Sequence, residues 1–252
     1  MLATIEHSGK KFRIDFSKPL DISIPLKEGN KTVNAYFAPR LKIEPVKMGD
    51  WIGEVKQGAL VNYRNIFFNP HGNGTHTECV GHISKENISI NQCLKEFFFV
   101  ADLISIKPEK IGDDFIIVKS QISNLKSQIS NKDAVILRTL PNEESKLTRN
   151  YSGKNPPYIE SKAIFYLVSL GINHILIDLP SLDRGEDGGK LLAHKAFWNF
   201  PKNPKKHRTI TELIYVSDEI KDGTYLLNLQ IAGFENDATP SKPVLYKLFS
   251  EK

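Results

Sequence analysis

A strand–helix–strand succession in the second half of the sequence restricts the possible folds more than any other feature. Ala134–Thr139 and residues 174–178 are short apolar runs rich in branched side chains, which is typical of buried strands. Between them, residues 161–170 have the pattern of a helix, with Ser161 as candidate N-cap and Gly171 just past its end. Two strands joined by a helical crossover usually pair in parallel. The sequence therefore predicts an α/β fold.

The first 70 residues are rich in strand-forming side chains. Residues 11–16 alternate apolar and polar positions, and residues 21–26 repeat that alternation up to a proline. Residues 35–38 and 61–68 also contain strand-forming residues, with Gly and Asn between the segments. We expect this part of the chain to be mainly β-structure.

Residues 120–131 contain the pentapeptide SQISN twice. Ile122, Leu125 and Ile129 then fall on one face of a helix, so we interpret the segment as one amphipathic helix and not as a repeat protein. No linker rich in Pro, Gly or Ser separates the two halves of the chain. We therefore expect a single domain over residues 1–252.

The composition is that of an ordinary soluble globular protein, with 40% apolar and 25% charged residues. No stretch approaches the roughly 18 consecutive apolar residues of a membrane span, and the N-terminus does not resemble a signal peptide. Cys79 and Cys93 do not indicate a disulfide framework. We expect a cytoplasmic protein without a membrane partner.

The net charge of +5 is modest, and its clearest concentration is a proline-broken loop over residues 202–208. A nucleic-acid surface would combine basic residues on one element with aromatic residues or a known binding motif. Because neither is present, we interpret the loop as solvated and expect no nucleic-acid partner. The weakest hypothesis, a nucleic-acid-binding module, depends on four residues of this loop: Lys202, Lys205, Lys206 and Arg208.

Three of the seven histidines and a glutamate lie within twelve residues: His71, His76, Glu78 and His82. Imidazole and carboxylate groups at short spacing are suitable ligands for a divalent metal, since the carboxylate offsets the charge of the cation. If residues 75–78 are extended, His76 and Glu78 project from the same face of a strand. The segment thus predicts a metal or catalytic site.

Such a site needs further ligands from elsewhere in the chain. His194 lies in a helix-like segment, residues 190–197, and Glu212 lies among strand-forming apolar residues. A glutamate in that setting must be solvated, paired or bound to a metal. Taken alone, each of the two residues is more often structural than functional.

Several motifs, in order, resemble the cyclase-like metal-dependent hydrolases, the superfamily of kynurenine formamidase and isatin hydrolase. Residues 74–78 with His82 are similar to the family signature H-x-G-T-H-x-D-x-x-x-H. Residues 21–26 are similar to D-L-S-x-P-L, and residues 170–183 to G-x-x-x-x-x-x-D-x-x-S-x-D. His194 and Glu212 fall where ligands of that family follow, and residues 237–240 resemble its closing D-G-x-P.

The chain departs from the family signature at three points. Gly72 stands where the family has its first histidine, so that His71 is displaced by one position. Glu78 replaces an aspartate and is one methylene longer. The family's Asp-Ala-Pro run becomes Glu78-Cys79-Val80. These changes indicate a divergent member.

The resemblance implies a mixed, partly barrel-like β-sheet flanked by helices, of the swivelling β/β/α type. It implies that His76, Glu78, His194 and Glu212, together with His71, bind one or two divalent ions, zinc or manganese. His82, left off the metal, would act as general base and then general acid. The implied activity is hydrolysis of an N-formyl amide or a lactam of a small, flat metabolite. Family members commonly form homodimers or larger homo-oligomers.

A second hypothesis from a different class remains open. The displaced His71 is compatible with a non-catalytic or metal-free homologue that binds a small molecule. A metal-dependent hydrolysis assay discriminates between the two hypotheses.

Overall fold

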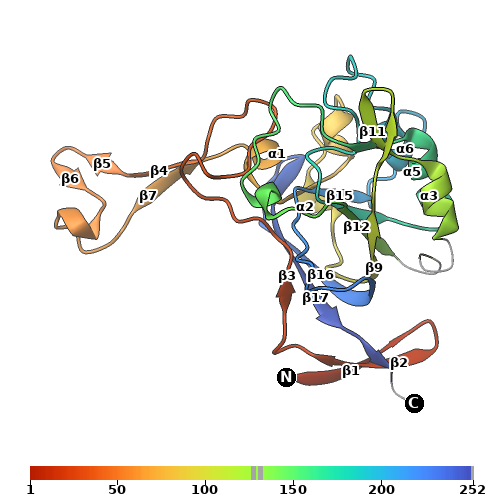
Figure 1. Ribbon diagram of the computed structural model, residues 1–252. Coiled ribbons are helices and arrows are strands. Elements are labelled where there is room, and N and C mark those ends of the chain that lie inside the picture. The colour runs from red at the N-terminus through yellow and green to blue at the C-terminus, as the bar shows by residue number, and fades with distance from the viewer. Residues whose placement is uncertain (126–128, 130–132, 251–252) are drawn as a thin grey trace.

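The computed structural model describes residues 1–125, 129 and 133–250, and its centre is a closed, barrel-like mixed sheet (Figure 1). Seven strands follow one another around the ring in the order β16-β9-β12-β14-β15-β8-β17, and β17 pairs with β16 to close it. This confirms the predicted α/β class and the barrel-like sheet. The ring strands are β8 (His76–Glu78), β9 (Phe98–Ile106), β12 (Ala134–Thr139), β14 (His174–Ile177), β15 (Thr209–Glu212), β16 (Gly223–Ile231) and β17 (Ala238–Lys247).

The predicted crossover forms the parallel part of the barrel. β12 and β14 are parallel neighbours, joined through α5 (Ser161–Ser169). Glu160, and not Ser161, occupies the N-cap position, and Gly171 adopts a left-handed φ of 92° after the helix. The buried face of α5 packs over the sheet together with α3 (Lys119–Asn124) and α6 (Leu192–Trp198), and all three helices lie on one side of the barrel (Figure 1).

The short strand β8 belongs to the antiparallel part of the ring. β8 pairs with β15 so that His76 lies opposite Glu212, and with β17 so that Glu78 lies opposite Ala238. All three residues of β8 are buried. The register therefore brings two predicted ligands, from opposite halves of the sequence, to adjacent positions on one sheet.

The N-terminal part of the chain contributes less strand than the sequence predicts. β1 (Leu2–His7) and β2 (Lys10–Asp15) form a small sheet with β18 (Phe249–Ser250), and β3 (Leu20–Asp21) pairs with β17. Residues 21–26 were expected to be one strand, but the strand ends at Asp21. The Asp21 carboxylate accepts hydrogen bonds from the backbone and hydroxyl of Ser23 and turns the chain there.

A two-stranded arm extends away from the barrel (Figure 1). It consists of β4 (Lys42–Pro45) and β7 (Arg64–Phe67), with β5 (Lys47–Met48), β6 (Trp51–Ile52) and the 3-10 turn η1 (Val55–Gln57) towards its tip. Every residue of β7 is exposed. The arm leads directly into the short helix α1 (Pro70–Asn73), which carries His71.

The structure describes only part of the predicted helix over residues 120–131. α3 covers its first half, with Ile122 fully buried, and residues 126–128 and 130–132 lie outside the described part of the chain. Within the described part, no helix has the length and hydropathy needed to cross a membrane. The remaining elements are β10 (Glu109–Ile111), β11 (Asp114–Ile117), β13 (Tyr158–Ile159), α2 (Ile90–Cys93), η2 (Val80–Ile83) and η3 (Glu144–Leu147).

Candidate metal centre

All six predicted site residues lie in one cluster. β8 supplies His76 and Glu78, β15 supplies Glu212, and α6 supplies His194. The remaining two lie on short helical turns on either side of β8, His71 on α1 and His82 on η2. Residues that are far apart in the sequence thus meet around β8.

His76 is fully buried, and its orientation is fixed by the backbone next to it. Nδ1 lies 3.1 Å from the carbonyl oxygen of Gly74, which places the ring proton on that nitrogen. Nε2 is left with its lone pair facing the carboxylate of Glu212, whose Oε2 is 3.4 Å away. This is the tautomer that a metal-binding histidine requires.

Glu78 is fully buried and is surrounded by three imidazoles. Its Oε2 lies 3.1 Å from Nδ1 of His71 and 3.8 Å from Nδ1 of His82, and its Oε1 lies 3.2 Å from Nε2 of His194. Burial by itself would raise the pKa of this carboxyl group, but His82, His194 and His71 together hold that pKa well below its usual value. Glu78 is therefore a carboxylate at the centre of the cluster.

His194 is oriented by a carboxylate that the sequence-based site did not include. Its Nδ1 lies 2.6 Å from Oδ2 of Asp183, and the same carboxylate accepts hydrogen bonds from two backbone amides, that of Ala193 at Oδ1 and that of His194 at Oδ2. Nε2 therefore points at Glu78, with Oε1 of Glu212 at 3.7 Å. Burial would lower the pKa of His194, but Asp183 and Glu78 raise it to about 10.

His71 reaches the cluster despite its displacement by one position. Its Nδ1 faces Glu78, and its Nε2 lies 2.9 Å from Oδ2 of Asp237. Burial would lower the pKa of this imidazole, but the two carboxylates raise it to about 10. One ring between two carboxylates is an arrangement in which a cation can replace a proton.

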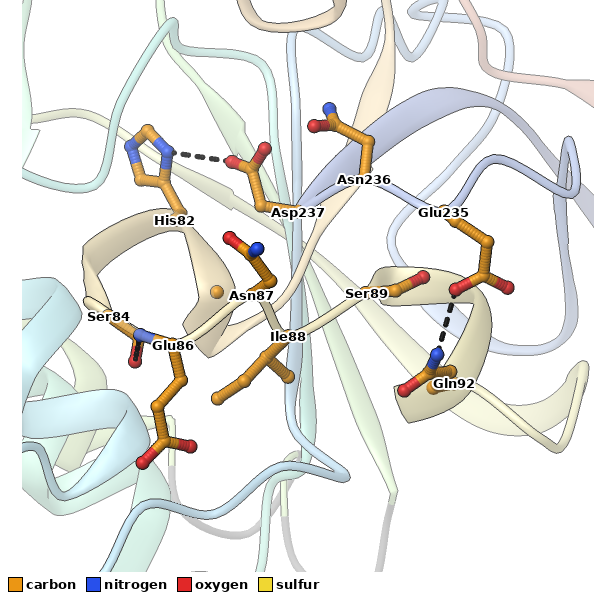
Figure 2. Close-up of a pocket in the computed structure, with 11 residues that line it drawn as sticks. His82, Ser84, Glu86, Asn87, Ile88, Ser89, Gln92, Glu235, Asn236 and Asp237 are labelled. Carbon is orange, nitrogen blue, oxygen red and sulfur yellow. Dashed lines mark hydrogen bonds and ion pairs between the residues drawn. The ribbon is translucent and has the colours of Figure 1, made fainter.

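His82 projects from η2 towards Asp237 and borders a cavity of about 470 Å³. Figure 2 shows the contact, in which Nδ1 of His82 lies 3.2 Å from Oδ2 of Asp237. The backbone of this turn is closely packed, because a Cβ atom at Gly81 would lie 2.0 Å from the carbonyl oxygen of Ile88. The cavity wall is mostly polar and includes Ser84, Asn87, Ser89, Gln92, Glu235 and Asn236.

Two aspartates of this site, Asp183 and Asp237, were not among the predicted site residues. Asp183 lies in the loop after residue 178, and Asp237 lies in the segment that resembles the closing D-G-x-P. Their places in these family motifs were the only sequence signal that could have identified them. Their roles could not be inferred from spacing, since each contacts a histidine on another element. In the structure, both hold imidazoles in place.

The donor set fits a divalent metal ion. Among the described residues, Nε2 of His76 is buried without a hydrogen-bond partner, and Oε2 of Glu78 has only its ion-pair contacts with His71 and His82. Buried polar atoms are costly unless something satisfies them. Three overlapping sets have ligand atoms close enough to share an ion: His71, His76 and Glu78; His71, His82 and Asp237; and Glu78, His82 and His194.

The chain thus combines a closed barrel-like sheet with a buried histidine–carboxylate cluster that could hold a divalent cation. Residues 20–184 match the protein family described as Putative cyclase, which covers most of the chain. The chain therefore belongs to the cyclase family, as the sequence motifs predicted.

Solved structures with the same fold include several hydrolases. A potential metal-dependent hydrolase with cyclase activity superposes with a TM-score of 0.64 at 19% identity, covering 91% of this chain and 98% of the other. Isatin hydrolase A from Labrenzia aggregata gives 0.65 at 15% identity, with 91% and 93% covered. The Ralstonia solanacearum enzyme gives 0.65 at 12% identity, with 91% of each chain covered. No curated protein sequence matches this chain.

Proposed function

We propose that the chain is a metal-dependent hydrolase that cleaves an amide bond in a small molecule. One observation carries the proposal: the buried Glu78 carboxylate lies among three imidazoles, and atoms of Glu78 and His76 point into the cluster without a hydrogen bond among the described residues. Such an arrangement brings several nitrogen and oxygen donors to one buried point, which suits a cation. The fold shared with hydrolases supports the same proposal.

In this proposal the residues divide into two groups. His76, Glu78, His194 and Glu212, with His71, hold one or two divalent ions, and zinc or manganese suits their nitrogen and oxygen donors. When bound, the ion supplies a Lewis acid and water of lowered pKa. His82 is the proposed general base and acid, because its ring borders the cavity and Asp237 fixes its orientation.

The proposed reaction adds water to the carbonyl carbon and breaks the C–N bond, which gives a carboxylate and an amine. His82 accepts the proton from water and delivers it to the leaving nitrogen. An N-formyl amide or a lactam fits this scheme, and the isatin hydrolases of the same fold support the lactam in particular. The cavity beside His82 offers space for a small substrate.

The test is the metal content per chain together with hydrolysis of a panel of N-formyl amides and lactams. We expect one or two zinc or manganese ions per chain, and activity that a chelator removes and the metal restores. Glu78→Gln keeps the shape of the side chain but removes the central charge, so we expect metal affinity to fall by more than about 100-fold. Glu219→Gln, on an exposed residue, is the matched control.

Two outcomes would contradict this proposal. If neither metal binds, even after incubation, the chain is the metal-free small-molecule binder of the second hypothesis. The displacement of His71 by one position is the feature that favours that alternative. If metal binds stoichiometrically but none of the panel is hydrolysed, the metal centre stands and the proposed amide chemistry is wrong.

Asp237→Asn tests the orientation of His82. The substitution retains the size of the side chain but removes the charge that faces Nδ1 of His82 and Nε2 of His71. Because outer carboxylates of this kind typically contribute 10–100-fold, we expect kcat to fall by about that factor. Asp15→Asn, at the end of β2 and away from the cluster, is the control. Unchanged turnover in Asp237→Asn would exclude the orienting role.

A further inference from the structure

The turn Ala35–Ala38 has a backbone conformation that its sequence does not favour. The amide of Ala38 donates to the carbonyl oxygen of Ala35 over 3.0 Å, and the two central residues, Tyr36 and Phe37, have φ values of 56° and 54°. Turns of this kind normally use Gly, Asn or Asp at these positions. A bulky side chain in the left-handed region costs on the order of 1–2 kcal/mol per residue. The surroundings must therefore hold the turn in place.

Burial of the Phe37 ring does not explain this strain. Phe37 is 78% exposed, and its backbone amide donates to the hydroxyl of Ser152. Tyr36 differs, because it is 47% exposed but its hydroxyl donates to the carbonyl oxygen of Pro180 over 2.8 Å. The conformation of the turn thus directs the Tyr36 hydroxyl towards Pro180 and places the amides of Ala35 and Phe37 against Gly72 and Ser152.

On one side, the turn lies directly against the helix that carries His71. The amide of Ala35 donates to the carbonyl oxygen of Gly72 over 3.0 Å. A Cβ atom at Gly72 would lie 2.4 Å from Cβ of Ala38 and 2.9 Å from the carbonyl oxygen of Ala35. No side chain fits at position 72 unless the turn moves. This explains why the imidazole comes from position 71, one residue before the family position.

On the other side, the turn holds the loop that orients two predicted ligands. The hydroxyl of Tyr36 donates to the carbonyl oxygen of Pro180, which begins this loop. The next two residues in this loop contact the ligands directly. The amide of Leu182 donates to Oε1 of Glu212 over 3.1 Å, and the carboxylate of Asp183 binds His194.

We propose that the turn Ala35–Ala38 is a positioning element that sets the spacing between the two ligand segments of the metal centre. It fixes α1 with His71 through Gly72, and it fixes residues 180–183, and through them His194 and Glu212, through the hydroxyl of Tyr36. The inference rests on the proposed function only in taking these residues as ligands. The left-handed backbone at Tyr36 and Phe37 is the cost of contacting both segments at once.

The first test is Tyr36→Phe, which removes the hydroxyl and keeps the ring. In metal-free protein, we expect hydrogen exchange at the amides of Leu182 and Asp183 to become about 5-fold faster, as for loss of one hydrogen bond. We expect affinity for Zn²⁺ or Mn²⁺, measured by competition with a chelator, to fall roughly 10-fold. Tyr225→Phe is the matched control, because the hydroxyl of Tyr225 also donates to a backbone carbonyl, that of Lys221, away from the centre.

The second test exchanges two residues to restore the family order, His71→Gly with Gly72→His. A site controlled by the signature alone would bind metal as well as the native chain or better. If the turn controls the site, affinity falls at least roughly 10-fold, because the new side chain meets Ala38 and Ala35.

The two tests separate this inference from the proposed function. Native exchange rates in Tyr36→Phe would overturn the positioning role whether or not the protein binds metal. Native metal affinity in the exchanged variant would overturn the role of the turn in displacing the ligand. Failure of amide hydrolysis, with both sets of results as expected, would refute only the proposed reaction.

Discussion

His82→Ala is expected to lower turnover of the amide substrate by roughly 10²- to 10⁴-fold, the usual contribution of a positioned general acid–base group. Metal content is expected to stay at the native value, because Glu78 keeps two other imidazole neighbours, His71 and His194. KM should change little, since the loss affects proton transfer and not substrate binding. The measurement is kcat and KM together with metal per chain for the same preparation.

A matched substitution makes this result specific. His207 is an exposed histidine outside the cluster, with Nε2 3.2 Å from the side chain of Asn173, and His207→Ala should retain native turnover. If His82→Ala loses its metal as well as its activity, His82 is a ligand and not the proton carrier. If it keeps full activity, His82 has no part in the reaction.

The largest expected loss of stability follows from Lys146→Met. The ammonium group of Lys146 is buried and lies 2.7 Å from Oδ2 of Asp178, which is also buried and accepts two hydrogen bonds from Thr139. Removing the cation leaves the carboxylate of Asp178 buried without its charge partner. We expect the free energy of unfolding to fall by about 3–5 kcal/mol, measured by urea denaturation.

An exposed ion pair provides the comparison. Lys242 lies 2.9 Å from Asp21, and both side chains are substantially exposed, so Lys242→Met should cost at most about 1 kcal/mol. Equal effects of the two substitutions would show that burial of the Lys146–Asp178 pair has no energetic importance. Each comparison requires the same slope of the denaturation curve, so that the unfolded states are alike.

The parallel half of the barrel could be predicted from the sequence because its signals are local. The apolar runs of β12 and β14 and the helical period of α5 are visible within a few residues of each other, and the structure has them almost as predicted. Closure of the ring could not be predicted this way. It depends on β8 pairing with both β15 and β17, which follow much later in the sequence.

The turn Ala35–Ala38 shows where sequence patterns fail. Tyr and Phe are strand-forming residues, so the sequence predicts extended structure there. The observed turn is held by contacts to Gly72, Ser152 and Pro180, and all three lie far away in the sequence. Tertiary contacts override the local preference at this position.

The proposed ligands and the proton carrier of the candidate site could be predicted from the sequence. His76, Glu78, His82, His194 and Glu212 were singled out by residue type, spacing and motif, and the structure brings them together. What the sequence could not reveal is the outer layer of carboxylates. Asp183 and Asp237 act through contacts with histidines on other elements, which no local pattern encodes.

The position of β8 has a consequence for biosynthesis. β8 lies between β15 and β17 in the sheet. His76 and Glu78 of β8 leave the ribosome well before either of these strands has been synthesised. The segment with His71, His76 and His82 therefore lacks its neighbouring strands, β15 and β17, while more than half of the sequence is still being synthesised. Long-range pairings of this kind form late. We infer that the proposed ligand set is complete only after Glu212, at the end of β15, has been synthesised, so that an ion held by all five residues would bind late in folding.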